Sequence, residues 1–195
     1  MAAPLIVGIG GTTGGGSSTE AALHIALAAA GARGARTLMF GGEALADLPH
    51  YNPKSPMRTP GETALVAAVR EASGLILASP GYHGNVSGVV KNALDLLEET
   101  ARDEGRAYLT DLPVGLIATA YGWQATGSTI AALRAIAHAF RGWPTPFAAA
   151  VNSRLCRFDE SGAPGDPDVA VQLALVGRQV ADFALRAAMP LDIAS

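Results

Sequence analysis

The chain of 195 residues contains a single cysteine, Cys156, and only two lysines, Lys54 and Lys91. One cysteine excludes an intrachain disulfide and a multi-cysteine metal cluster. The formal net charge is −3 and no basic stripe occurs, which argues against nucleic-acid binding. We therefore expect neither a disulfide scaffold, nor a metal site, nor a nucleic-acid-binding protein.

Long hydrophobic runs are also missing. The longest apolar segments are rich in alanine and interrupted by glycine and arginine, so none has the length of a membrane span. The first residues, Met1 to Pro4, carry no positively charged side chain, unlike the start of a secretory signal. Apolar residues nevertheless make up 49% of the chain, enough for a sizeable core. We expect one domain over residues 1–195 in a soluble cytoplasmic protein without membrane partners.

Short apolar runs alternate with segments of helical periodicity along the chain. Runs without polar alternation indicate strands buried on both faces of a parallel sheet. Five strands are expected, at residues 5–9, 36–40, 75–78, 113–118 and 147–151. Five helices are expected at about 17–30, 61–73, 85–97, 128–141 and 169–187. The alternation predicts an α/β fold with helices on both faces and right-handed crossovers. The proline-rich segment 41–60 should be irregular, and Pro144 should separate the fourth helix from the last strand.

The stretch from Pro80 to Asp95 carries the most specific motif. Pro80, Gly81 and Gly84 predict a turn directly after a buried strand. Open α/β sheets bind ligands at this end of their strands, although an ordinary strand–helix connection has the same features. The stretch resembles the second flavin loop of the NAD(P)H-dependent FMN reductase family, roughly P-x-Y-x-[GS]-x-x-x-G-x-[LM]-K-N-[AF]-[LI]-D. The resemblance extends over about residues 4–151 and implies a flavodoxin-like three-layer sandwich with strand order 2-1-3-4-5.

A second glycine-rich loop follows the first strand. Ser17 and Glu20 form a capping box at the start of a helix, and a helix N-terminus after a glycine- and hydroxyl-rich loop is a physical anion site. A P-loop is excluded because no lysine precedes Lys54. A dinucleotide fingerprint starting at Gly8 is weak, because Thr13 stands at its third glycine.

The same loop is similar to the phosphate loop of the FMN reductases, G-S-x-R-x-x-S-x-[NT]. Gly11, Thr12, Ser17 and Thr19 fall on this pattern, with threonine in place of its serine. Gly14 occupies the position of the family's arginine, which removes the only positive side chain of the loop. A flexible glycine turn with a good helix cap remains the alternative interpretation.

The resemblance implies three loops around a flavin. The phosphate would be held by the first loop, the ring system by the second, and the other side would be closed by the loop after the fourth strand. The implied residues are Thr12, Gly14, Ser17, Ser18 and Thr19; Pro80, Tyr82, His83, Gly84, Asn85 and Val86; and Thr119, Ala120, Tyr121 and Gly122.

No catalytic side chain is expected, because flavin carries the chemistry. His24, His50 and His138 are expected to be structural or exposed, and Cys156 to be a small buried hydrophobe. His83 stands where the family usually has asparagine, and a contact with the flavin is expected there.

The leading hypothesis is an enzyme that transfers a hydride from NAD(P)H to FMN, supplying reduced FMN to a partner monooxygenase or reducing quinones. The alternatives are a flavodoxin-like electron carrier and a flavin-free relative. A carrier usually has a strongly acidic surface, and a net charge of −3 favours the reductase. The resemblance also implies a homodimer or homotetramer.

Overall fold

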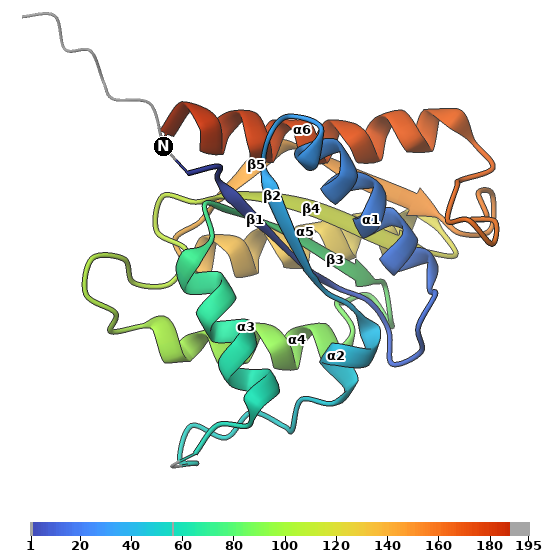
Figure 1. Ribbon diagram of the computed structural model, residues 1–195. Coiled ribbons are helices and arrows are strands. Elements are labelled where there is room, and N and C mark those ends of the chain that lie inside the picture. The colour runs from blue at the N-terminus through green and yellow to red at the C-terminus, as the bar shows by residue number, and fades with distance from the viewer. Residues whose placement is uncertain (1, 56, 188–195) are drawn as a thin grey trace, which may run out of the picture.

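The computed structural model describes residues 2–55 and 57–187, and its centre is a five-stranded parallel sheet (Figure 1). The strands are β1 (Leu5–Gly10), β2 (Arg36–Phe40), β3 (Gly74–Pro80), β4 (Pro113–Ala120) and β5 (Trp143–Asn152). Their order is β2-β1-β3-β4-β5, and all four neighbouring pairs are parallel. The expected fold class and strand order are confirmed.

Helices cover both faces of the sheet. They are α1 (Ser18–Gly31), α2 (Gly42–Ala46), α3 (Pro60–Glu71), α4 (Gly88–Asp95), the 3₁₀ helix η1 (Leu96–Thr100), α5 (Trp123–Ala139) and α6 (Pro167–Ala187). Helices α1 and α6 lie together on one face, and α3, α4 and α5 lie on the other (Figure 1). No helix within the described ranges combines the length and apolar character that a membrane crossing requires.

Alternation along β1 distributes its side chains between two cores. Ile6 packs in the cluster beneath α1 and α6, whereas Val7 and Ile9 pack in the cluster beneath α3, α4 and α5. All three side chains are fully buried. A strand covered on both faces must be apolar at every position, which is why its sequence shows no polar alternation.

Helices α1 and α6 approach each other very closely. A Cβ atom added at Gly177 would lie 1.9 Å from the carbonyl oxygen of Ala26, so only glycine fits at this contact. Further along the pair, Arg33 forms an ion pair with Asp182 at 2.6 Å. This packing holds α1, and with it the loop that precedes it, against the sheet.

Strand β5 is longer than expected and contains two prolines. Its ladder pairs Val114 with Pro144, shifts register, and resumes with Leu116 opposite Ala148. Because β5 is at the edge of the sheet, the missing N–H groups of Pro144 and Pro146 leave no neighbouring strand unpaired. The expectation that Pro144 lies before the strand is therefore wrong.

Two helix starts differ from the sequence prediction, and one short helix was not expected. Helix α4 begins at Gly88 rather than near 85, because Ser87 is its N-cap and accepts a hydrogen bond from Val90 N. Helix α5 begins at Trp123 rather than at 128, and its buried Thr126 and Thr129 hydroxyls donate to carbonyls of the same helix. The short helix α2 lies in the segment expected to be irregular.

One side chain of α6 faces the other way. Helical periodicity from Val169 predicts that Phe183 points inward, but Phe183 is 43% exposed and the neighbouring Ala184 is buried instead.

Candidate functional site

Three loops meet at the carboxyl edge of the sheet. They follow β1 (residues 11–17), β3 (81–87) and β4 (121–122). The register pairs Gly10 of β1 with Ala78 of β3, and Pro80 of β3 with Thr119 of β4, so the three strands end side by side. This edge includes the switch in strand order between β1 and β3, where doubly wound sheets bind ligands.

The first loop is held in place by α1 and α2. Ser17 caps α1, and the side chain of Glu20 completes the predicted capping box by accepting from Ser17 N at 3.4 Å. The other carboxylate oxygen of Glu20 accepts from Gly42 N at 2.8 Å, which ties the starts of the two helices together. A Cβ atom at Gly42 would lie 1.9 Å from the carbonyl oxygen of Thr12. The backbone of α2 therefore packs directly on this loop.

Several polar groups of the first loop are already paired. The Thr12 hydroxyl donates to the carbonyl oxygen of Gly14 at 3.0 Å, so its proton is not directed at a ligand. The Ser17 hydroxyl accepts from Glu20 N at 3.3 Å but retains its own proton for donation. The N–H groups of Ser18 and Thr19 lie in the first turn of α1 and have no intrahelical acceptor. These groups can bind an anion at the helix N-terminus.

Thr19 and Thr119 lie beneath the loops rather than at their surface. Both side chains are buried, at 1% and 3% exposure, and their hydroxyl oxygens are 2.6 Å apart. This hydrogen bond joins the first turn of α1 to the end of β4. The two residues thus hold the first and third loops in register.

The second loop contains a tight two-residue turn. Tyr82 and Asn85 exchange both backbone hydrogen bonds, with Tyr82 N to Asn85 O at 3.0 Å and Asn85 N to Tyr82 O at 3.1 Å. Between them, His83 and Gly84 both have positive φ, of 50° and 85°. Positive φ at both central residues is the conformation of a type I′ turn, which favours asparagine and glycine.

Buried polar groups anchor this turn to the sheet. The Ser79 hydroxyl is fully buried and accepts from Ser87 N at 2.9 Å, which fixes the chain where it enters α4. Gly81 N donates to the carbonyl oxygen of Thr119 at 2.8 Å. A Cβ atom at Gly81 would lie 2.7 Å from the Thr129 hydroxyl, so the loop lies tightly against α5. The turn is therefore a rigid platform.

Exposed aromatic side chains surround the three loops. Tyr82 is 52% exposed, Tyr121 is 81% exposed and Trp123, the first residue of α5, is 60% exposed. Large aromatic rings that remain in water at a sheet edge provide stacking surfaces for a planar ligand.

The expected site residues divide into two groups. Exposed or partly exposed at the edge are Thr12, Gly14, Ser17, Ser18, Tyr82, His83, Gly84, Asn85, Val86, Tyr121 and Gly122. Buried beneath it are Thr19, Pro80, Thr119 and Ala120. The structure thus brings all three loops together and adds a supporting layer under them.

Asn92 has a role that the motif alone did not reveal. Its side-chain oxygen accepts from Tyr51 N at 2.8 Å and its amide nitrogen donates to the carbonyl oxygen of Pro49 at 2.9 Å. Arg58 continues the attachment through ion pairs with Glu62 and Glu99. The proline-rich segment after α2 is thus fastened to α4 and η1. The Lys91-Asn92 dipeptide of the motif was the available signal.

The groups expected to be inert are located as predicted. Cys156 is buried in the cluster beneath α1 and α6. His24, His50 and His138 are exposed, and His83 is exposed on its turn. No group of three or more His, Cys, Asp or Glu that could hold a metal ion occurs among residues 2–55 and 57–187.

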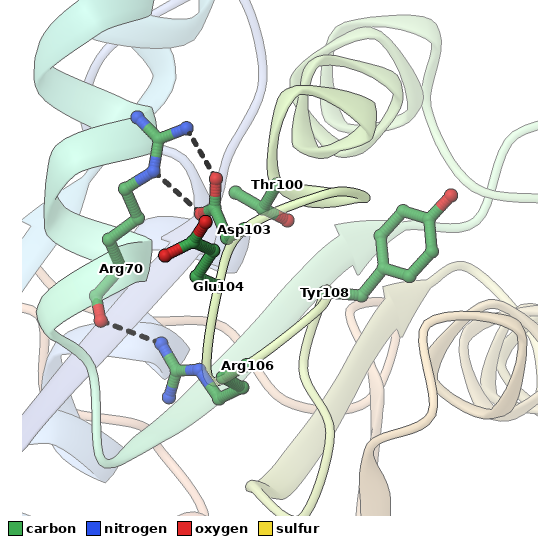
Figure 2. Close-up of a pocket in the computed structure, with 6 residues that line it drawn as sticks. All are labelled: Arg70, Thr100, Asp103, Glu104, Arg106 and Tyr108. Atoms are coloured by element: carbon green, nitrogen blue, oxygen red, sulfur yellow. Dashed lines mark hydrogen bonds and ion pairs between the residues drawn. The ribbon is translucent and has the colours of Figure 1, made fainter.

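A separate hollow of about 290 Å³ lies at the opposite edge of the sheet, where α3 leads into β3 (Figure 2). Arg70 donates two hydrogen bonds to the carboxylate of Asp103, at 2.7 and 2.9 Å, and these hold the pKa of Asp103 below its usual value. Arg106 donates to the carbonyl oxygens of Val69, Arg70 and Ala72 at 2.6 to 2.7 Å. Burial lowers the pKa of Arg106. Arg70, Asp103 and Arg106 of the lining are thus paired with one another or with the end of α3.

Comparison with solved structures supports this architecture. An oxidoreductase from Corynebacterium diphtheriae superposes with a TM-score of 0.72 at 19% identity, covering 94% of this chain and 98% of that one. The apo form of an NADH:FMN oxidoreductase (EMOB) gives 0.70 at 24% identity, covering 96% and 92%. The NAD(P)H:(acceptor) oxidoreductase FerB from Paracoccus denitrificans gives 0.66 at 18% identity, covering 94% and 98%. At these identities the likeness shows the fold.

Sequence comparison identifies the family. No curated protein sequence matches this chain. The profile of the NADPH-dependent FMN reductase family matches residues 4–154, which include all three loops of the sheet edge. The chain therefore belongs to the NADPH-dependent FMN reductase family and is an NAD(P)H-dependent flavin oxidoreductase that uses FMN.

Proposed function

We propose that the three loops at the carboxyl edge of the sheet hold FMN. The phosphate end would lie over the first turn of α1, at the hydroxyls of Ser17 and Ser18. The ring system would lie along the turn from Tyr82 to Asn85 and be closed by Tyr121 and Gly122. The exposed rings, the rigid turn and the open helix N-terminus support this placement.

The residues of the chain bind and orient, while bound FMN supplies the hydride chemistry. The backbone groups of the second loop are fixed by the Ser79 hydroxyl and by Thr119 O, so they can hold a polar ring edge without reorganising. Tyr82, Tyr121 and Trp123 can exclude water from the face on which a nicotinamide would stack. The three loops contain no buried histidine that could move a proton, and we assign that role to no residue.

The first loop also bears on how FMN is used. We infer that FMN exchanges with solvent between turnovers and that reduced FMN serves an acceptor outside the site, such as a partner monooxygenase; a quinone is the other candidate. The observation that carries this inference is Gly14. It stands at the arginine position of the phosphate loop, and a Cβ built on it meets no atom within 4 Å. The loop thus offers no charged hydrogen bond where the family has one.

The magnitude of this loss is sufficient to make FMN exchangeable. A hydrogen bond to a charged group contributes about 1.5–3 kcal/mol. Every 1.4 kcal/mol corresponds to about tenfold in affinity. The dipole of α1 adds only about 0.3–1 kcal/mol at an exposed end. We therefore expect a dissociation constant at least about tenfold weaker than that of the same site with arginine at position 14.

NAD(P)H oxidation by dialysed protein tests the proposal. A reductase that exchanges FMN should be colourless after dialysis and inactive until FMN is added, and then oxidise NAD(P)H continuously with oxygen as acceptor. An electron carrier should remain yellow and oxidise NAD(P)H slowly under both conditions. Retention of one FMN per chain through dialysis would contradict the exchange, and absence of flavin binding would contradict the site.

We also propose a homodimer or homotetramer, in which the helical segments near 86–103 and 127–141 contribute to the interface. Family members place the flavin beside a subunit boundary, and the exposed ring of Trp123 lies next to the second of these segments. Light scattering at micromolar concentration should give a multiple of 19.8 kDa. A monomeric mass would contradict the assembly without affecting the flavin site.

A further inference from the structure

A carboxylate from another segment of the chain lies beside the first loop. Glu43 is in the first turn of α2, the helix that packs on this loop. A Cβ atom built on Gly15 would lie 3.3 Å from a carboxylate oxygen of Glu43. Glu43 is exposed and lies in the segment between β2 and α3, which is not part of the phosphate-loop motif. Its carboxylate therefore stands beside the residues proposed to surround the flavin phosphate.

Glu20, in the first turn of α1, places another carboxylate beside the same loop. Its oxygens accept from Ser17 N and from Gly42 N, so the group lies between the starts of α1 and α2. Neither Glu20 nor Glu43 takes part in any of the ion pairs found within residues 2–55 and 57–187. The loop itself has glycine at the family's arginine position. Two negative charges thus lie beside the first loop, and neither has an ion-pair partner within the described residues.

A flavin phosphate would also find fewer donors than the loop composition suggests. The Thr12 hydroxyl donates to Gly14 O, Ser17 N bonds to Glu20, and the Thr19 hydroxyl is buried against Thr119. A dianionic phosphate must therefore offset the repulsion of two carboxylates with a small set of backbone and serine donors. The ring loops around Tyr82 and Tyr121 are unaffected by this balance.

We propose that Glu43 is a specificity-determining residue that cancels the usual preference for the phosphate. The substrate class of this enzyme is then the flavin ring with its ribityl chain, and riboflavin binds about as tightly as FMN. This inference rests on the proposed flavin site. The flavin is then recognised by the second and third loops, and the phosphate changes the binding free energy very little.

Equilibrium titration monitored by flavin fluorescence tests the inference without using activity. In the wild type, the dissociation constants of FMN and riboflavin should agree within about fivefold. Glu43→Gln removes one charge with little change of shape and should tighten FMN binding about three- to tenfold, while riboflavin binding stays the same. Asp47→Asn is the matched control, because it removes one exposed carboxylate at the other end of the same helix. It should change neither constant.

The salt dependence of FMN binding is a second measurement. It changes in opposite directions for repulsion by carboxylates and for attraction by an arginine. Raising the ionic strength from about 0.02 M to about 0.3 M screens repulsion, so wild-type FMN binding should become tighter or stay unchanged. A phosphate held by an arginine from elsewhere in the chain would bind more weakly in salt. FMN binding more than about fivefold tighter than riboflavin, or weakening with salt, overturns the inference while leaving the flavin site intact. Failure of both flavins to bind overturns the site and the inference together.

Discussion

The buried hydrogen bond between Thr19 and Thr119 allows a sharp test of how the site is built. The two hydroxyls are separated by 100 positions in the sequence, and each residue is almost completely buried. Valine is close in shape to threonine and suits both positions, since it tolerates a helix and favours a strand. Thr19→Val, Thr119→Val and the double variant therefore form a clean double-mutant cycle.

The expected energies follow from the burial. Each single variant leaves one buried hydroxyl without its partner, which costs about 1–3 kcal/mol of the free energy of unfolding. Replacing both hydroxyls with methyl groups of similar shape removes this penalty and is nearly neutral. We therefore expect each single variant to lose about 2 kcal/mol and the double variant about 1 kcal/mol or less, a coupling of about 3 kcal/mol.

Urea unfolding followed by circular dichroism, without flavin, measures the four free energies. Additive losses in the double variant would refute the reasoning, because they would mean that the two hydroxyls do not satisfy each other. An FMN titration of the double variant then separates two roles. Unchanged FMN affinity means that the threonines support the loops from below, whereas a loss of about tenfold, or 1.4 kcal/mol, means that a hydroxyl contacts the flavin.

Three further predictions concern the turn and the opposite edge of the sheet. Gly84→Asn should keep the positive-φ turn and the wild-type stability but weaken FMN binding at least about tenfold. Gly84→Val should weaken FMN binding as well and also lose about 1–2 kcal/mol of the free energy of unfolding in urea. Normal FMN affinity of the asparagine variant in a titration would contradict a flavin at this turn. Arg106→Ala should cost about 2–4 kcal/mol in urea unfolding, because three carbonyl oxygens at the end of α3 lose a charged donor, and a loss below about 0.5 kcal/mol would show that water replaces it. Hydrogen bonds from Arg70 lower the pKa of Asp103 in the folded state, so the pair stabilises the protein above the ordinary aspartate pKa and this contribution is lost as the pH falls through the lowered value. Asp103→Asn should therefore cost about 0.5–1 kcal/mol near neutral pH and show a smaller loss of stability on acidification below about pH 4; identical pH profiles would contradict the assignment.

Local patterns in the sequence determined the class of fold and pointed to the candidate site. The unbroken apolar runs of β1, β3 and β4 can be satisfied only by burial on both faces, which requires helices on each side of a parallel sheet. The Ser17–Glu20 capping box is formed by neighbouring residues, so its pattern was sufficient to locate the start of α1. The flavin-loop motif was likewise contiguous, and its position after a buried strand indicated the carboxyl edge of the sheet, where the three loops meet.

Tertiary structure alone decided the features that join distant segments. The prolines of β5 are compatible with a strand only because that strand is at an edge, and edge position is a property of the sheet. The N-cap of α4, Ser87, is fixed by a residue of the sheet, because its N–H donates to the buried hydroxyl of Ser79 at the end of β3.

The same distinction applies to the chemistry of the site. Sequence reveals the hydroxyl side chains of Thr19 and Thr119 but not that they are hydrogen-bonded to each other across 100 residues. Sequence alone does not place Glu43 near the first loop, because its charge comes close to this loop only through the packing of α2. Electrostatic effects depend on distance in space, so only the fold could show that carboxylates lie beside the loop proposed to hold the phosphate.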